Sequence, residues 1–140
     1  KLNAQAKAIY EDVLQKNPDV EPAINNLASL LTDQFQSEAN LEKAAEIADR
    51  FKLASEPYYL DTYAWINVKL GHLEKAQSVL ERVVSLSPDA PVFNYHLGVL
   101  YNKQGNTIQA EQYLTKAQRL ASEQGDAVTE TIVSELLSKL

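Results

Sequence analysis

Residues that could carry acid–base or metal chemistry are few and scattered in this chain. The two histidines, His72 and His96, lie far apart, and neither belongs to a cluster with metal-ligand spacing. Glu42 and Glu46 share one helix face at i, i+4, which is typical of a solvated surface. The sequence has no cysteine and no nucleophile elbow, phosphate loop or H-E-x-x-H motif. It therefore predicts neither an enzyme nor a metal or cofactor site.

The aromatic side chains indicate binding chemistry instead. The stretch LDTYAWINVKLG, residues 60–71, holds the single tryptophan, Trp65, and Tyr58 lies seven residues before it. In a helix this spacing places both rings on one face, with Asp61 and Lys69 one turn to either side of Trp65. Aromatic rings with polar edges on an exposed face usually mark binding surfaces. Whether Trp65 is such a residue or part of the core depends on the fold that holds it.

Composition favours a folded helical protein. The chain has 140 residues, of which 45% are hydrophobic and 23% charged, with only 4 glycines and 5 prolines. These proportions are typical of one globular domain of ordinary size. The formal net charge of −6 argues against binding to a phosphate backbone, and no apolar run is long enough to cross a bilayer. We expect no nucleic-acid partner and no membrane insertion, and the lack of methionine indicates a piece of a longer protein.

A repeat of 34 residues runs through the chain. Two stretches that begin at Pro57 and Pro91 align without a gap, which pairs Gly71 with Gly105 and Ala76 with Ala110, each 34 residues apart. The glycines allow a positive φ at the end of a first helix, and the prolines suit the start of the next repeat. Small residues, such as Gly98 and Ala110, let two antiparallel helices approach closely.

Altered copies lie at both ends of this pair. PDVEPAINNLASLL from Pro18 matches PDAPVFNYHLGVLY from Pro88, but TDQFQSEAN then inserts about four residues between the two helices. The insertion is either drift tolerated at low cost or a contact loop, and we expect Phe35 within it to fold back onto the core. The pattern predicts helices at 2–16, 20–34, 40–53, 57–70, 73–86, 91–104, 107–122 and 126–139. Asp126 is the expected N-cap of the last one.

This pattern resembles the tetratricopeptide repeat family over nearly the whole chain, through Leu97-Gly98, Tyr101, Gly105, Ala110, Leu114 and Ala117. The resemblance implies an all-α, right-handed solenoid in one domain, with a concave face lined by the first helix of each repeat. The expected parts are a half-repeat (1–19), three repeats (20–56, 57–90 and 91–124) and a C-terminal helix (125–140).

A narrower resemblance concerns Asp61-Thr62-Tyr63-Ala64-Trp65 and the copies around it. This part of the sequence is similar to bacterial envelope tetratricopeptide proteins of exopolysaccharide export and the PEP-CTERM sorting system. This similarity implies a scaffold on the periplasmic side of a bacterial envelope. Another group of the repeat family, the chaperone-binding tetratricopeptide domains, holds a peptide C-terminal carboxylate with Lys and Arg on first helices. The matching places here hold neither residue, so we expect no such clamp. Those places are Asn25, Asn26, Ser29, Thr62, Val92 and His96.

In this fold one row of each first helix faces the concave groove, and we expect that row to bind a peptide or protein segment. Its candidate partner-binding residues are Asn25, Ser29, Tyr58, Asp61, Trp65, Lys69, Tyr95, Asn102 and Lys103. Trp65 either anchors the partner or packs on Tyr95 or the stem of Lys69 and supports the groove. The alternatives are homo-oligomeric assembly through the open helical ends and polysaccharide binding by stacked aromatic rings.

Overall fold

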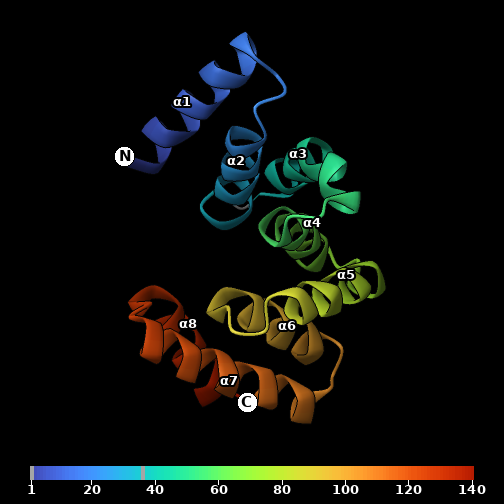
Figure 1. Cartoon of the computed structure of the whole chain (residues 1–140), viewed down its shortest axis with the longest axis vertical. Coiled ribbons are helices and arrows are strands. Elements are labelled where there is room, and N and C mark those ends of the chain that lie inside the picture. Colours follow the sequence, from blue (N-terminus) through green and yellow to red (C-terminus); the bar gives the residue numbers. More distant parts are fainter. Residues whose placement is uncertain (1, 36) are drawn as a thin grey trace. The chain divides into compact units, whose positions relative to one another are not determined.

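Every regular element is helical in the computed structural model, which describes residues 2–35 and 37–140 (Figure 1). Lys1 in the expected half-repeat and Gln36 in the expected insertion lie outside the described residues. The elements are α1 (Leu2–Lys16), α2 (Glu21–Asp33), α3 (Glu38–Ala48), the 3₁₀ helix η1 (Asp49–Leu53), α4 (Pro57–Lys69), α5 (Leu73–Leu86), α6 (Pro91–Lys103), α7 (Thr107–Gln124) and α8 (Ala127–Ser138). The all-α class and the succession of eight α-helices are confirmed.

The predicted helix boundaries hold at Gly71, Gly105 and Asp126, whereas α7 runs two residues past the predicted end at 122 and stops at Gln124, before Gly125. Gly71 and Gly105 adopt φ of 87° and 82° at the ends of α4 and α6, as their positions predict. The Asp126 side chain accepts a hydrogen bond from the Thr129 amide at 3.1 Å, which confirms it as the N-cap of α8. The helix predicted over 40–53 is partly wrong, because the Ser37 hydroxyl caps the Asn40 amide and α3 starts at Glu38. Its last five residues form η1.

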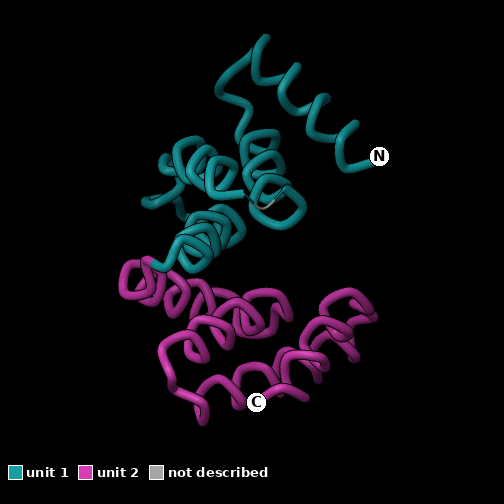
Figure 2. Tube along the Cα trace, turned by 180° about the vertical axis from the view of Figure 1, so that it is seen from behind, with its two compact units in different colours: residues 1–71 teal, residues 72–140 magenta. Residues whose placement is uncertain are grey.

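The chain divides into two compact units, residues 1–71 and 72–140, drawn in teal and magenta in Figure 2. The boundary falls in the turn between α4 and α5. The expected single solenoid domain, with its superhelical stacking and concave face, spans both units and remains a prediction.

In the first unit, α2 packs against α1, α3 and α4. Alanines at 0% exposure, Ala28 in α2 with Ala44 and Ala48 in α3, keep these helices close. The rings of Phe51 in η1 and Tyr59 in α4 stack with centroids 4.6 Å apart. By contrast, no described residue of α1 is buried, so α1 is held only along one side.

In the second unit, α6 packs against α5 and α7, and α7 packs against α8. Gly98 is the point of closest approach, because a Cβ atom there would lie 2.7 Å from Cγ and Cδ2 of Leu114. The expectation that a small residue permits close packing at this position is confirmed. Across α5 and α6, the Tyr101 hydroxyl donates to Glu81 at 2.8 Å.

Phe35, within the expected insertion, folds back onto its own unit. The Phe35 amide donates to Leu30 O at 3.2 Å, and its carbonyl accepts from Asn40 Nδ2 at 2.7 Å. The Phe35 ring is half-buried, with the ammonium of Lys7 5.9 Å from its centroid. These contacts agree with the expectation for Phe35 and tie the loop to α1, α2 and α3.

Candidate partner-binding surface

Helix α4 is enclosed around its whole circumference. Nine consecutive residues, Leu60 to Val68, are buried, although an amphipathic surface helix would bury only one stripe. The position of Trp65 beside the apolar stripe therefore does not expose its ring, which is only 4% accessible. Asp61, another residue of the predicted row, is 6% accessible. Of the two roles considered for Trp65, the packed one describes this geometry.

Trp65 is fixed by polar residues at the C-terminal ends of two helices. Its indole N–H donates a hydrogen bond to Asp33 Oδ1 at 3.0 Å, and Asp33 is the last residue of α2. The ammonium of Lys69, the last residue of α4, lies 4.7 Å from the centroid of the Trp65 ring. A buried indole needs an acceptor for its N–H, and a cation over its face adds attraction. The predicted contact with Lys69 is present, whereas Tyr95 belongs to the other unit and that part stays a prediction.

Tyr58 is the exposed aromatic residue of the predicted row in α4. Its side chain is 58% accessible, although it starts a helix that is otherwise buried. The backbone beneath it is tied down, because the Glu56 carboxylate accepts from the Tyr58 amide at 3.2 Å and Thr62 Oγ1 donates to the Tyr58 carbonyl at 3.0 Å. An aromatic ring on a fixed backbone costs little entropy to order when a partner covers it.

The α2 residues of the row, Asn25 and Ser29, are half-buried. The side-chain oxygen of Asn25 is buried and accepts no hydrogen bond from any residue that the structure describes. Ser29 and Asp33 border a hollow of about 240 Å³ between α1 and α2. The hollow is lined by Ala6, Tyr10, Asn26, Ser29, Leu30, Asp33 and Gln34. We give the name α2–α4 surface to the residues Asn25, Ser29, Asp33, Tyr58 and Lys69. Asp33 is included because it accepts the hydrogen bond from the Trp65 indole. The candidate partner-binding residues predicted from the sequence did not include Asp33.

In the second unit, the candidate partner-binding residues of α6 differ in their exposure to solvent. Tyr95 packs partly against the core of Leu114, Ala117 and Val133, and its ring centroid lies 4.9 Å from that of His96. Asn102 and Lys103 are exposed at the C-terminal end of α6. Only part of the Tyr95 ring is therefore available to a partner.

The described residues offer little for catalysis. They contain no group of three or more His, Asp or Glu side chains that could hold a metal ion. His72 is exposed and His96 buried, in line with the solvated and packed roles expected for them. Burial, together with the hydrogen bond to Glu81, raises the pKa of Tyr101, which keeps this phenol protonated as a structural donor. None of the described helices has the length and apolarity that a membrane span requires.

Comparisons with known proteins agree with this architecture. A tetratricopeptide repeat family model matches residues 58–90 and 92–124. TTC0263, a thermophilic TPR protein of Thermus thermophilus, superposes with a TM-score of 0.74 at 18% identity, covering 97% of this chain and 73% of that one. YrrB, a TPR protein with an unusual peptide-binding site, gives a TM-score of 0.68 at 19% identity, covering 96% of this chain and 66% of its own.

A third similar structure is PcrH of Pseudomonas aeruginosa, solved in complex with the chaperone binding region of PopB. It has a TM-score of 0.66 at 19% identity and covers 84% of this chain and 96% of PcrH. Such identities establish the fold alone. No curated protein matches the chain in sequence, and the narrower resemblance to envelope proteins stays a prediction.

The 34-residue period, the positive-φ glycines, the close packing at Gly98 and the family match point to one conclusion. Residues 58–90 and 92–124 are tandem repeats of the tetratricopeptide repeat family.

Proposed function

We propose that this chain is a non-catalytic scaffold that binds a segment of another protein on its α2–α4 surface. The observation that carries the proposal is the contrast within α4, where nine consecutive residues are buried and Tyr58 is 58% exposed. Tyrosines on rigid elements are frequent energetic hot spots of protein interfaces. Partner contacts by Tyr95, Asn102 and Lys103 remain a separate prediction for the second unit.

The chemistry of the α2–α4 surface suits a segment with both polar and apolar groups. The buried acceptor of Asn25 would take a hydrogen bond from a backbone amide or a hydroxyl of the partner. Tyr58 would cover an apolar or proline side chain, while Trp65 supports the surface from beneath through Asp33 and Lys69. Two similar structures give precedent, since PcrH binds the chaperone binding region of PopB and YrrB has a peptide-binding site.

A peptide-display library selected against the intact chain tests this function. Selected peptides would be titrated by fluorescence anisotropy on the parent chain and on the variants Tyr58→Ala and Lys69→Gln. The matched control is Leu53→Ala, which removes an apolar side chain that is 85% exposed in the same unit. We expect Tyr58→Ala to weaken binding about tenfold or more, as a hot-spot residue does, with no change in the control. Failure to select any peptide, or equal binding by Tyr58→Ala, refutes the proposal.

Homo-oligomeric assembly is the second candidate, because exposed apolar residues lie on the first and last helices. Leu2 and Ile9 of α1 are 81% and 60% accessible, and Val128 of α8 is 72% accessible. Light scattering over a concentration series decides this, since a constant monomer mass removes the candidate. Polysaccharide binding is the remaining alternative, and with Trp65 only 4% accessible it would rely on the rings of Tyr58 and Tyr95.

A further inference from the structure

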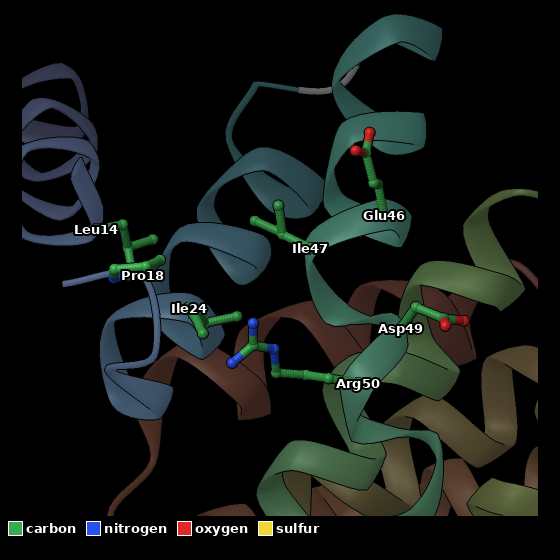
Figure 3. A pocket seen from close by; sticks show the side chains of 7 residues that line it. All are labelled: Leu14, Pro18, Ile24, Glu46, Ile47, Asp49 and Arg50. Atoms are coloured by element: carbon green, nitrogen blue, oxygen red, sulfur yellow. The ribbon is translucent and has the colours of Figure 1, made fainter.

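A separate pocket of about 480 Å³ lies between α1, α2 and α3 in the first unit (Figure 3). Its lining residues are Leu14, Pro18, Ile24, Glu46, Ile47, Asp49 and Arg50. We call it the α1–α3 pocket. Its volume falls in the range of about 300–1,000 Å³ that is usual for ligand sites.

The wall of the α1–α3 pocket is largely aliphatic, and one of its positions differs between the repeats, which place Ile24, Leu60 and Asn94 there in turn. Ile24 in α2 corresponds to Asn94 in α6. Asn94 is fully buried, and its amide donates to the carbonyls of Pro88 at 3.0 Å and Ala90 at 2.9 Å, which ties α6 to the preceding turn. Ile24 has no such donor and adds hydrocarbon to the floor of the pocket, where 3% of its surface is accessible. Figure 3 shows Leu14, Ile24 and Ile47 approaching the pocket from three different helices.

The rim of the α1–α3 pocket is charged, and its charges are unequally compensated. Asp49 pairs with Lys52 at 3.2 Å, and Arg50 pairs with Asp19 at 3.5 Å. Glu46 is exposed, and within the described part of the chain no cation lies at ion-pair distance from it. The uncompensated charge at the rim is therefore negative, beside an aliphatic wall.

From this combination we infer that the α1–α3 pocket binds a short segment of a partner protein that carries a bulky aliphatic residue next to a lysine or arginine. The aliphatic side chain fills the space between Leu14, Ile24 and Ile47. The basic group reaches Glu46. The hydrocarbon stem of Arg50 extends the apolar wall, as long cationic side chains do.

This pocket is a different site from the α2–α4 surface. Ile24 and Ser29 both lie on α2, and five residues of an α-helix turn the side-chain direction by about 140°. The inference does not depend on the proposed function, and the substitution Tyr58→Ala should leave binding at the α1–α3 pocket unchanged.

Pools of short fluorescent peptides test the inference on the intact chain. Each pool has a fixed leucine followed by a fixed Lys, Gln or Glu, with the other positions randomised. Anisotropy measures affinity, and the methyl NMR signals of Ile24 and Ile47 report where the peptides bind. We expect the Lys pool to bind most tightly and to shift both methyl signals, and the Glu pool to bind most weakly.

Two variants separate the aliphatic and charged contributions. Glu46→Gln should weaken the affinity for the Lys pool by about two- to fivefold, which is the size expected for an ion pair at the rim. The affinity for the Gln pool should not change. Ile47→Ala should weaken both pools by about tenfold, because it removes apolar wall. Ile108→Ala, an 86% exposed position in the other unit, is the control and should change nothing.

Three outcomes would overturn the inference. The first is a tighter Glu pool, which would assign recognition to Arg50 and an anionic group. The second is peptide binding that leaves the Ile24 and Ile47 methyl signals in place. The third is no binding of the Lys pool at millimolar peptide. Circular dichroism of Ile47→Ala checks that its helices remain formed.

Discussion

The indole N–H of Trp65 donates to a carboxylate oxygen of Asp33 across 3.0 Å, which joins the C-terminal ends of α4 and α2. Asp33 is exposed while Trp65 is buried, so the hydrogen bond connects a solvated carboxylate to an enclosed ring. Lys69 completes the arrangement over the ring face at 4.7 Å. This relationship makes Trp65 a structural support of the α2–α4 surface.

Trp65 emission should be blue-shifted and poorly quenched by acrylamide. The ring is 4% accessible, and a single tryptophan makes the signal unambiguous. Emission of the urea-unfolded chain provides the reference for an exposed indole. A red-shifted, readily quenched signal from the native chain would contradict the packing of Trp65.

Trp65→Phe should lower the free energy of unfolding by about 2 kcal/mol, because the ring keeps most of its apolar contacts but loses the hydrogen bond to a charged acceptor. Asp33→Asn retains a side-chain oxygen and should cost less. Urea unfolding followed by far-ultraviolet circular dichroism measures both without relying on tryptophan emission. Equal stability of Trp65→Phe and the parent chain would show that the bond to Asp33 is energetically unimportant.

Local rules predicted most of the fold, because they act over a few residues. Gly71 and Gly105 were identified from their spacing, and their positive φ follows from the turn they form. The start of α3 was missed because the cap at Ser37 lies inside an irregular insertion, where no repeat position guides the alignment.

The burial of the candidate site could not be predicted in the same way. Helical periodicity locates a residue on a helix face, but it does not say how many neighbours enclose that helix. Trp65 and Asp61 lie outside the apolar stripe and are nevertheless buried, because α4 is covered on all sides. Tyr58, on the same row, is exposed because it lies in the first turn.

Gly98→Ala should destabilise the second unit by about 1–3 kcal/mol despite the better helix propensity of alanine. The new methyl group would meet Leu114, which is 1% accessible and would have to shift within the packed core. Gly105→Ala is the comparison: nothing lies within 4 Å, and its cost comes only from a φ of 82°. Thermal unfolding of Gly98→Ala, Leu114→Ala and the double variant measures the interaction free energy between the two positions. Strict additivity would contradict the clash.

Tyr101→Phe should make the free energy of unfolding less dependent on pH in the alkaline range. Burial raises the pKa of the Tyr101 phenol in the folded chain above its ordinary value of about 10. The protonated phenol therefore stabilises the fold fully below about pH 10, and this contribution is lost as pH rises further through the folded pKa. Unfolding curves at increasing alkaline pH should fall more steeply for the parent chain than for Tyr101→Phe. Parallel curves would contradict the raised pKa.

Backbone amides of α1 should exchange with deuterium faster than those of α6. No described residue of α1 is buried, whereas eight residues of α6 are. We expect Glu11 to slow amide exchange in α1, because its carboxylate pairs with Lys7 at 3.2 Å and with Lys43 of α3 at 3.4 Å. Partial burial raises the pKa of Glu11, but the hydrogen bonds and charges of these two lysines outweigh it and hold the pKa below its ordinary value.

The lowered pKa of Glu11 determines how the ion pair between Glu11 of α1 and Lys43 of α3 depends on pH. Its contribution is present above the unfolded pKa of about 4.3 and is lost as pH falls through the lower folded value. Glu11→Gln should therefore speed exchange in α1 at neutral pH and leave α6 unchanged. In strong acid, where the parent Glu11 is itself protonated, the two chains should exchange alike. Slow exchange in α1 of the variant at neutral pH would show that α1 is held by its contact with α2 alone.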